Sequence, residues 1–347
     1  MRMGNKPARS SGTRLGRVVG GACLFVAAAL ALAGLWFRGQ LQPLPAGDEF
    51  YFRVETPKGL REAMYELSSR GVVRNANVWF RYGQAVNAPR TIGEGTYEIR
   101  PGMSPKELYK ALTVPVRRMV RIPETNWASR TGRLLEQQGV CTAEEYAAAI
   151  REPIRYQDKV GFRLPEGGTL EGYLYPDTYD LPPLLGAEGV VLRQLRAFED
   201  RVIRKKPLPD DLHRALIVAS LIELEVARDD ERPLVAGVIE NRLRIGMRLQ
   251  IDATVLYALD EWKNLSRKEI QDTDSPYNTY RYGGLPPGPI CSPTAKSVDA
   301  ALNPSEHDYL YYVALPDGSH LFSATYAEHL ANIAKRKRAL AAEEGGP

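Results

Sequence analysis

The sequence predicts an α+β protein with a single N-terminal transmembrane helix, a small α+β module and a larger mixed α+β domain. Three observations lead to this expectation. Residues 18–37 form a charge-free apolar run, short strand-like and helical patterns recur from residue 50 onward, and a strongly apolar helix at residues 215–227 ends in two acids. A chain of 347 residues is long enough for two or more domains, each with its own core.

The N-terminal segment has the pattern of an uncleaved membrane anchor. Residues 1–17 contain five basic residues and no acid, and the 20 residues of 18–37 are enough to cross a bilayer as a helix. Because basic flanks stay in the cytoplasm, we expect a cytoplasmic tail at 1–17 and an extracytoplasmic chain beyond a linker at 38–49. A signal peptide cleaved near residue 33 is the alternative, but the apolar run continues through Trp36 and Phe37.

Composition excludes several classes of protein. The net charge of +4 is small for this length and gives no sign of nucleic-acid binding. Cys141 and Cys291 lack metal-ligand spacing; a disulfide between them and two free thiols both remain open, and we favour free thiols. The sequence has no GxSxG, HExxH, Walker A or dinucleotide motif, and its four histidines lack ligand spacing, so we expect neither a metal nor a cofactor.

Residues 50–115 are expected to form the small α+β module. Residues 52–55 alternate like a strand, residues 60–70 have helical spacing, and Ser104 with Glu107 has the pattern of a capping box after a turn. The run GTYEIRPGMSPKELYKAL resembles the sugar-binding LysM-like modules of cell-wall proteins. An ordinary α+β linker domain is the competing interpretation.

Residues 116–206 are expected to be a connecting α+β region. It contains a strand with basic residues at 116–123, helices near 129–139 and 142–151, and then the aromatic loop LEGYLYPDTYDLP. Glu171 and Tyr175 of this loop are candidates for sugar binding, because aromatic rings stack on sugar rings and carboxylates accept hydrogen bonds from sugar hydroxyls. The competing interpretation is that these tyrosines pack a domain junction.

The apolar helix carries the candidate acid of a third region, residues 207–340. Glu223 and Glu225 point about 200° apart around a helix, so they should not share one site as a close pair. Leu221 and Ile222 lie four and three residues before Glu225 and should desolvate it, which favours its protonated form. We therefore predict Glu225 as the proton donor and Glu223 as the alternative.

Several long motifs follow one another along this region. They are, in order, LIVASLIELEVARDDERPLVAGVIENRLRIGMRLQIDATVLYAL, SPYNTYRYGGLPPGPICSP, NPSEHDYLYYV and HLFSATYAEH. Together with LEGYLYPDTY they resemble the YceG-like endolytic murein transglycosylase family, from the anchor to about residue 335. Leu224, Val226, Ala253 and the segment IPETNW depart from the usual pattern, and none of these departures removes the acid.

The resemblance implies a single-pass protein of the bacterial inner (plasma) membrane with a LysM-like module and a periplasmic catalytic domain. Such an enzyme cleaves nascent peptidoglycan at the MurNAc–GlcNAc β-1,4 bond, leaves 1,6-anhydroMurNAc ends and works beside the cell-wall synthesis machinery. The family's catalytic glutamate matches Glu225, which would act first as general acid and then as base. We expect Gln250, Asp252, Tyr277 and Asn278 to position the sugars.

Two other functions stay open at this point. The domain could be an inert peptidoglycan-binding scaffold, or it could be a true muramidase-type hydrolase that uses water. A hydrolase usually needs two carboxylates, whereas a ring-closing enzyme needs one.

Overall fold

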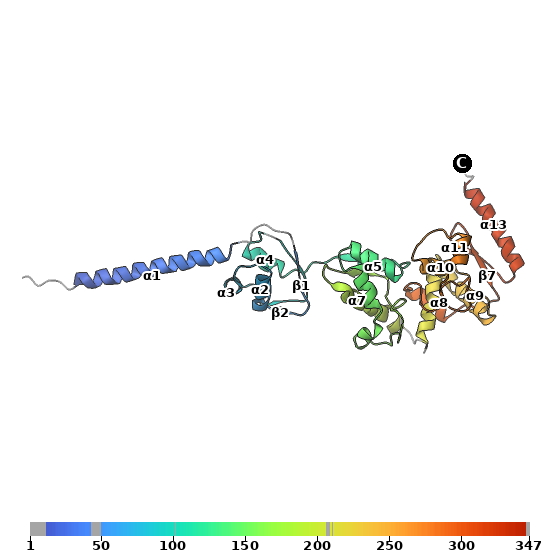
Figure 1. Ribbon diagram of the computed structural model, residues 1–347, viewed down its shortest axis with the longest axis horizontal. Coiled ribbons are helices and arrows are strands. Elements are labelled where there is room, and N and C mark those ends of the chain that lie inside the picture. Colours follow the sequence, from blue (N-terminus) through green and yellow to red (C-terminus); the bar gives the residue numbers. More distant parts are fainter. Residues whose placement is uncertain (1–11, 43–49, 101, 206–208, 210, 345–347) are drawn as a thin grey trace, which may run out of the picture. The chain divides into compact units, whose positions relative to one another are not determined.

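The computed structural model describes residues 12–42, 50–100, 102–205, 209 and 211–344. Most of the expected basic tail and most of the expected linker lie outside these residues. The chain divides into two compact units, Met1–Val116 and Arg117–Pro347, which are described separately. Within the described residues the protein is a mostly helical α+β structure with small two-stranded antiparallel sheets (Figure 1).

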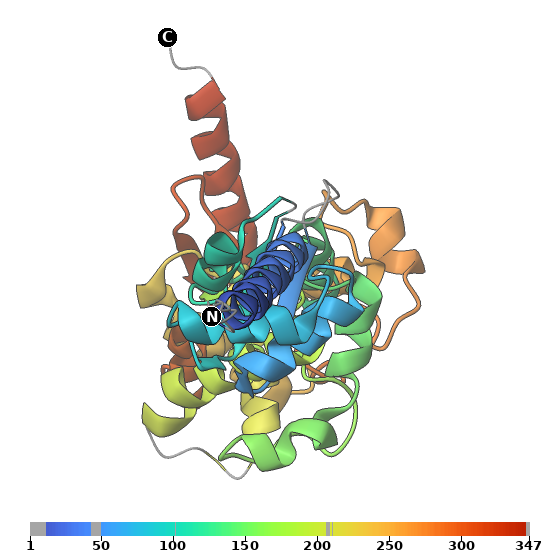
Figure 2. The same ribbon diagram turned by 90° about the vertical axis from the view of Figure 1, so that its left-hand side faces the viewer.

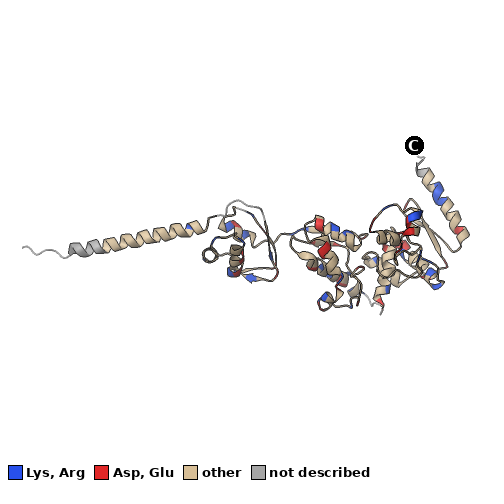
Figure 3. Cartoon of the chain, in the orientation of Figure 1, with Lys and Arg blue, Asp and Glu red and all other residues tan. Residues whose placement is uncertain are grey.

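The first unit begins with the apolar helix α1, Gly12–Gln40. Val19–Gln40 is long and apolar enough to cross a membrane, and the large apolar side chains along it are exposed. This candidate span ends three residues after the predicted span of 18–37, since the helix continues through Arg38, Gly39 and Gln40. In Figure 3 the part of this helix that is coloured by residue type is uncharged except near its end, where Arg38 lies in the last turn.

The rest of the first unit is a β–α–α–β arrangement. Strands β1 (Phe50–Val54) and β4 (Gly95–Ile99) pair antiparallel. Helices α2 (Leu60–Ser69) and α3 (Ala76–Ala85) lie between these two strands in the sequence. A second, two-residue pair joins β2 (Lys58–Gly59) to β3 (Thr91–Ile92). Helix α4 (Pro105–Ala111) starts with the predicted capping box of Ser104 and Glu107. Trp79 is fully buried in the core of this module.

The first part of the second unit is largely helical. Its elements are β5 (Met119–Arg121), α5 (Ala128–Gln137), α6 (Ala143–Ile150), η1 (Pro153–Lys159), β6 (Thr178–Asp180), α7 (Gly186–Arg201) and η2 (Ile203–Lys205). Strands β5 and β6 pair antiparallel and bring the start of this region to the end of the aromatic loop. Tyr173 of that loop is buried in the core, as expected of a tyrosine that packs the domain. Tyr175 is half-buried, so part of its ring is open to a ligand.

The second part is built around helix α8, Leu212–Glu225. Its further elements are η3 (Asp229–Glu231), α9 (Arg232–Arg244), α10 (Asp252–Leu259), α11 (Arg267–Asp272), α12 (Ala295–Leu302), β7 (Tyr311–Ala314), β8 (His320–Ser323) and α13 (Tyr326–Glu344). Residues 215–222 of α8 are apolar or small and are buried on every side of the helix, where α8 packs against α9, α10, α12 and the core of residues 120–202. The Asp211 carboxylate caps its start by accepting from the Arg214 amide.

Strands β7 and β8 pair antiparallel as a C-terminal hairpin, with Tyr312 opposite Phe322. Helix α13 leaves this hairpin, and its later turns extend away from the rest of the second unit (Figures 1 and 2). Cys141 is half-buried and Cys291 is buried, and both are free thiols.

Candidate active site

Glu225 is the last residue of α8 and is half-buried. Leu221 and Ile222, the residues predicted to desolvate it, are completely buried. The helix ends here because Val226 turns to an extended conformation. The Glu225 carboxylate accepts a hydrogen bond of 2.9 Å from the Tyr312 hydroxyl of strand β7.

Burial is the largest influence on the ionisation of Glu225, and it raises the pKa of this carboxyl. The Tyr312 hydrogen bond opposes that effect, the negative charge of Asp252 adds to it, and His320 and Arg242 oppose it more weakly. The site therefore contains one carboxyl that tends to hold its proton, with a second acid and two basic side chains around it.

The basic side chains are held by bonds of their own. His320 is bonded through Nδ1 to the Glu231 carboxylate at 2.6 Å, and its backbone amide donates to the same carboxylate at 3.0 Å. Its ring packs edge-on against Tyr312, with 5.5 Å between ring centroids. Arg242 donates to the Leu310 carbonyl at 2.6 Å, which ties α9 to the start of β7. These contacts hold the hairpin against the end of α8 and so fix the Tyr312 hydroxyl.

Glu223 lies in a separate environment, as its helical phase implies. It is 7 % exposed and accepts from the amide and the hydroxyl of Thr294, at 2.9 and 2.8 Å, just before α12. The Arg232 guanidinium lies 3.5 Å from the same carboxylate oxygen. Glu223 is thus more deeply buried than Glu225, which the sequence did not lead us to expect, and its charge is balanced by neighbours.

Three of the predicted sugar-positioning residues lie near α10. Gln250 is exposed, in a left-handed conformation with φ of 51°, just before the helix. Asp252 is the first residue of α10, and its exposed carboxylate accepts from the Tyr280 hydroxyl. Tyr277 is half-buried and packs on Tyr257, with 4.8 Å between ring centroids. Of these, only Asp252 is among the groups whose charge acts on Glu225.

Asn278 has no free amide group to offer a sugar. It is completely buried, and its amide nitrogen donates to the carbonyls of Ile270 and Thr273 at 2.8 and 2.9 Å. Its amide oxygen accepts from the Tyr280 backbone. The geometry is that of a residue that shapes the loop, so a direct contact with substrate is not supported.

Glu171 is also enclosed by the protein. It is 4 % exposed, and its carboxyl accepts from the Ala128 amide at 2.7 Å. Burial raises its pKa to about 8, so it is largely protonated at neutral pH. Enclosed in this way, Glu171 offers little surface to a sugar, and its role as a sugar contact stays a prediction.

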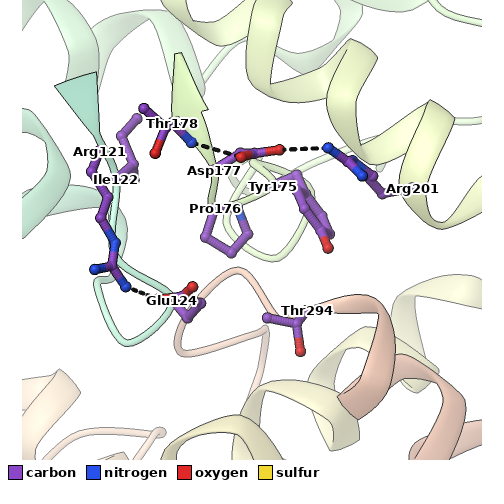
Figure 4. Close-up of a pocket in the computed structure, with 9 residues that line it drawn as sticks. All are labelled: Arg121, Ile122, Glu124, Tyr175, Pro176, Asp177, Thr178, Arg201 and Thr294. Atoms are coloured by element: carbon purple, nitrogen blue, oxygen red, sulfur yellow. Dashed lines mark hydrogen bonds and ion pairs between the residues drawn. The ribbon is translucent and has the colours of Figure 1, made fainter. Parts of the chain in front are cut away.

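Tyr175 lines a polar cleft of about 270 Å³ (Figure 4). Two ion pairs border this cleft, Arg121 with Glu124 and Arg201 with Asp177. Thr294, the residue that holds Glu223, lines the same cleft. The remaining lining residues are Ile122, Pro176 and Thr178. Tyr175 is therefore accessible, but on the side of α8 that carries Glu223.

Comparison with known proteins places this arrangement in a family. The model of the YceG-like family matches residues 52–335. The chain belongs to the YceG-like family. An endolytic murein transglycosylase of Bacillus subtilis is 40 % identical over 332 residues, which cover 88 % of this chain and 89 % of that protein. One of Streptococcus pneumoniae is 29 % identical over 350 residues, covering 88 % of this chain but only 63 % of the longer relative.

A solved structure agrees with the family assignment. A crystal structure of a YceG-like protein from Listeria monocytogenes superposes with a TM-score of 0.53 at 28 % sequence identity. The match covers 82 % of this chain and 99 % of the Listeria chain.

Within this YceG-like chain, the residues around Glu225 include several that sequence reasoning did not single out as site residues. Tyr312, His320, Glu231 and Arg242 come from four different elements, and the signal for Tyr312 was its place in the motif NPSEHDYLYYV. Strand alternation places Tyr312 on one face of β7, but which residue faces it becomes known only from the packing of the hairpin on α8.

Proposed function

We propose that the protein is a membrane-anchored endolytic lytic transglycosylase that cuts the MurNAc–GlcNAc β-1,4 bond of nascent peptidoglycan. The observation that carries the proposal is the single half-buried carboxyl of Glu225, whose pKa burial raises and whose orientation Tyr312 fixes. The family membership and the names of the relatives from Bacillus and Streptococcus support the same chemistry.

The reaction needs one group that gives and then takes a proton. Protonated Glu225 donates to the glycosidic oxygen as the bond from C1 to that oxygen breaks. The resulting carboxylate accepts the proton of the sugar's own 6-hydroxyl, whose oxygen bonds to C1 and closes the 1,6-anhydro ring. Glu225 ends in its starting state and no water is consumed. The Tyr312 hydrogen bond and the charges of His320 and Arg242 stabilise the carboxylate that forms midway.

The other residues predicted from the sequence have adjusted roles in the proposal. Asp252 and Gln250, at the start of α10, would contact sugars near Glu225, and Tyr277 would contact them farther along the helix. Asn278 would instead hold the loop, and Glu171 and Glu223 would stabilise the fold. Tyr175 would contact a part of the substrate that reaches the cleft of Figure 4.

The N-terminal part of the chain would place this chemistry at the cell wall. Helix α1 would span the inner (plasma) membrane once, with the catalytic unit on the periplasmic side. The LysM-like module of residues 50–115 would bind glycan near the membrane, where new strands emerge from the cell-wall synthesis machinery. Cutting there would limit the elongation of the strands.

A true hydrolase is the second candidate, because the charge of Asp252 acts on Glu225 and two carboxylates are what hydrolysis usually requires. Mass spectrometry of products from purified glycan strands separates the two, since a transglycosylase leaves anhydro ends and a hydrolase leaves reducing ends. We expect anhydro ends from the wild-type chain and a loss of about 10²–10⁴-fold in rate for Glu225→Gln.

Glu223→Gln is the matched control for the acid, because it makes the same change two residues away on the same helix. It should retain the chemistry. A fully active Glu225→Gln chain would overturn Glu225 as the acid. An inert wild-type chain that still binds glycan would overturn the proposal in favour of a scaffold.

A further inference from the structure

An exposed tryptophan lies just beyond the C-terminal end of α10. Trp262 is 50 % exposed, and its ring packs against the buried Trp127, with 5.9 Å between centroids and 41° between planes. Single exposed apolar side chains are common on protein surfaces, but tryptophan is among the residues most enriched at binding hot spots.

The surroundings of this ring are rigid. Asp260 caps α10 in a left-handed conformation, with φ of 53°. Its carboxylate accepts from the Trp127 indole at 2.6 Å and from the Arg133 guanidinium at 2.8 Å, and it is also bonded to the Ser129 hydroxyl. The loop that carries Trp262 is thereby tied to α5, which fixes the ring in place before any ligand arrives.

Arg130 supplies a charge at the same place. Its guanidinium carbon lies 5.1 Å from the centre of Trp127 and 5.9 Å from that of Trp262. Among the residues that the structure describes, no carboxylate pairs with it and no hydrogen bond uses its nitrogens. A stacked guanidinium with free donors is suited to a carboxylate on a ligand.

Aromatic side chains in contact with one another extend from Trp262 through Trp127 and Tyr257 to Tyr277. Asp252, whose charge acts on Glu225, is at the first turn of α10, and Trp262 follows the last turn. Tyr257 lies between them, packed on Tyr277 at 4.8 Å and on Trp127 at 5.9 Å. A helix of eight residues is about 12 Å long, so Trp262 follows the far end of a helix of this length, whose first residue, Asp252, acts on Glu225.

We infer that Trp262 and Arg130 form a distal glycan subsite, which binds a sugar of the same strand by stacking and its carboxylate substituent by charge. The inference rests on the proposed function and specifies how that site holds a long strand. The carboxylate is either the lactyl group of a muramic residue or a group of its attached peptide. A subsite of this kind explains how an enzyme favours internal bonds: only strands that extend past the cut on this side reach it.

The test compares cleavage of glycan strands of defined lengths by the full-length chain. For strands long enough to reach the subsite, Trp262→Ala should lower kcat/KM about tenfold through KM, with kcat unchanged. For the shortest strands that are cut, it should change nothing. Trp262→Leu keeps apolar contact with Trp127 but has no ring, so it should lose as much kcat/KM on long strands as Trp262→Ala. Trp262→Phe keeps an aromatic ring and should retain most of the wild-type kcat/KM on these strands.

Tyr326→Ala is the control for the loss of an exposed aromatic ring, because Tyr326 is 59 % exposed and lies on another element, helix α13. Equal loss on long and short strands, or equal loss in the Tyr326 control, would overturn the subsite. If the wild-type chain cut no strand at all, the proposed function would fail instead. The subsite would then be decided by binding of end-labelled strands to Glu225→Gln, with and without Trp262→Ala.

The charge is tested by affinity in the same Glu225→Gln chain. Arg130→Gln should weaken binding of peptide-free murein strands, which carry free lactyl carboxylates, and leave binding of neutral chitin oligosaccharides unchanged. Weakening only for strands with attached peptides would assign the carboxylate to the peptide. Equal binding of all three ligands by Arg130→Gln and its parent would overturn the role of Arg130.

Discussion

Glu171 should make the protein less stable as the pH rises towards neutrality. Its carboxyl is buried and uncharged, with a pKa near 8 in the folded protein against an ordinary value of 4.5. A group that holds its proton more tightly when folded stabilises the folded state at low pH, and this contribution is lost as pH rises from 4.5 to 8. Over the 2.5 pH units to neutrality, at about 1.4 kcal/mol each, the loss is about 3 kcal/mol at pH 7.

Replacing Glu171 with glutamine removes the titration but keeps the oxygen that accepts from the Ala128 amide at 2.7 Å. We therefore expect Glu171→Gln to be more stable than the wild type by about 3 kcal/mol at pH 7, or ~6–12 °C in Tm, and equally stable near pH 4. Differential scanning calorimetry of the detergent-solubilised chain across this pH range measures it.

The control for this experiment is Glu166→Gln, which changes a glutamate that is 81 % exposed in the preceding loop. It should shift Tm little at any pH. If Glu171→Gln destabilised the protein at pH 7, or changed Tm equally at pH 4 and pH 7, Glu171 would be ionised in the folded state and the reasoning would be wrong.

Three further predictions concern the helix and the loops around it. Tyr312→Phe removes the hydrogen bond that favours ionised Glu225, so the pKa of Glu225 should rise. The alkaline limb of the pH–rate profile should then move to higher pH by about 1 unit. An unmoved limb would show that Tyr312 does not influence the ionisation of Glu225. Arg232→Met leaves the Glu223 charge buried beside Thr294 and should lower the free energy of unfolding by about 3–5 kcal/mol, measured in urea, whereas the exposed Arg228→Met should lower it by less than about 1 kcal/mol. Asn278→Ala strands two backbone carbonyls and should cost about 1–3 kcal/mol in the same assay, with no change in KM for short strands; a raised KM would restore Asn278 as a sugar contact.

Local features of the fold could be predicted from the sequence because their causes are local. The capping boxes at Ser104 and Thr142 require only two residues three apart, and both are present in the structure. The 100° step of a helix separates Glu223 from Glu225, and the two carboxylates do contact different elements. The apolar N-terminal helix follows from length and composition alone.

The burial of particular carboxylates could not be predicted, because their partners are distant in the sequence. Thr294 lies 71 residues after Glu223, and Tyr312 lies 87 residues after Glu225. Glu171 resembled a surface acid among glycines and prolines, and only the packing of the loop against α5 encloses it. The assignment of Glu225 as the acid remains a prediction, since geometry locates a carboxyl but catalysis must be measured.

Helix α8 belongs to two hydrophobic cores at once. Leu216 and Ala219 pack with the helices of residues 117–205, whereas Val218, Leu221 and Ile222 pack with α9, α10 and the loop before α12. Because α8 contributes side chains to both cores, opening either core exposes part of a helix that the other core needs. Both cores should therefore unfold in one cooperative event. Amide hydrogens of α7 and α9 should then exchange through the same opening, and truncation before α8 should leave no foldable fragment.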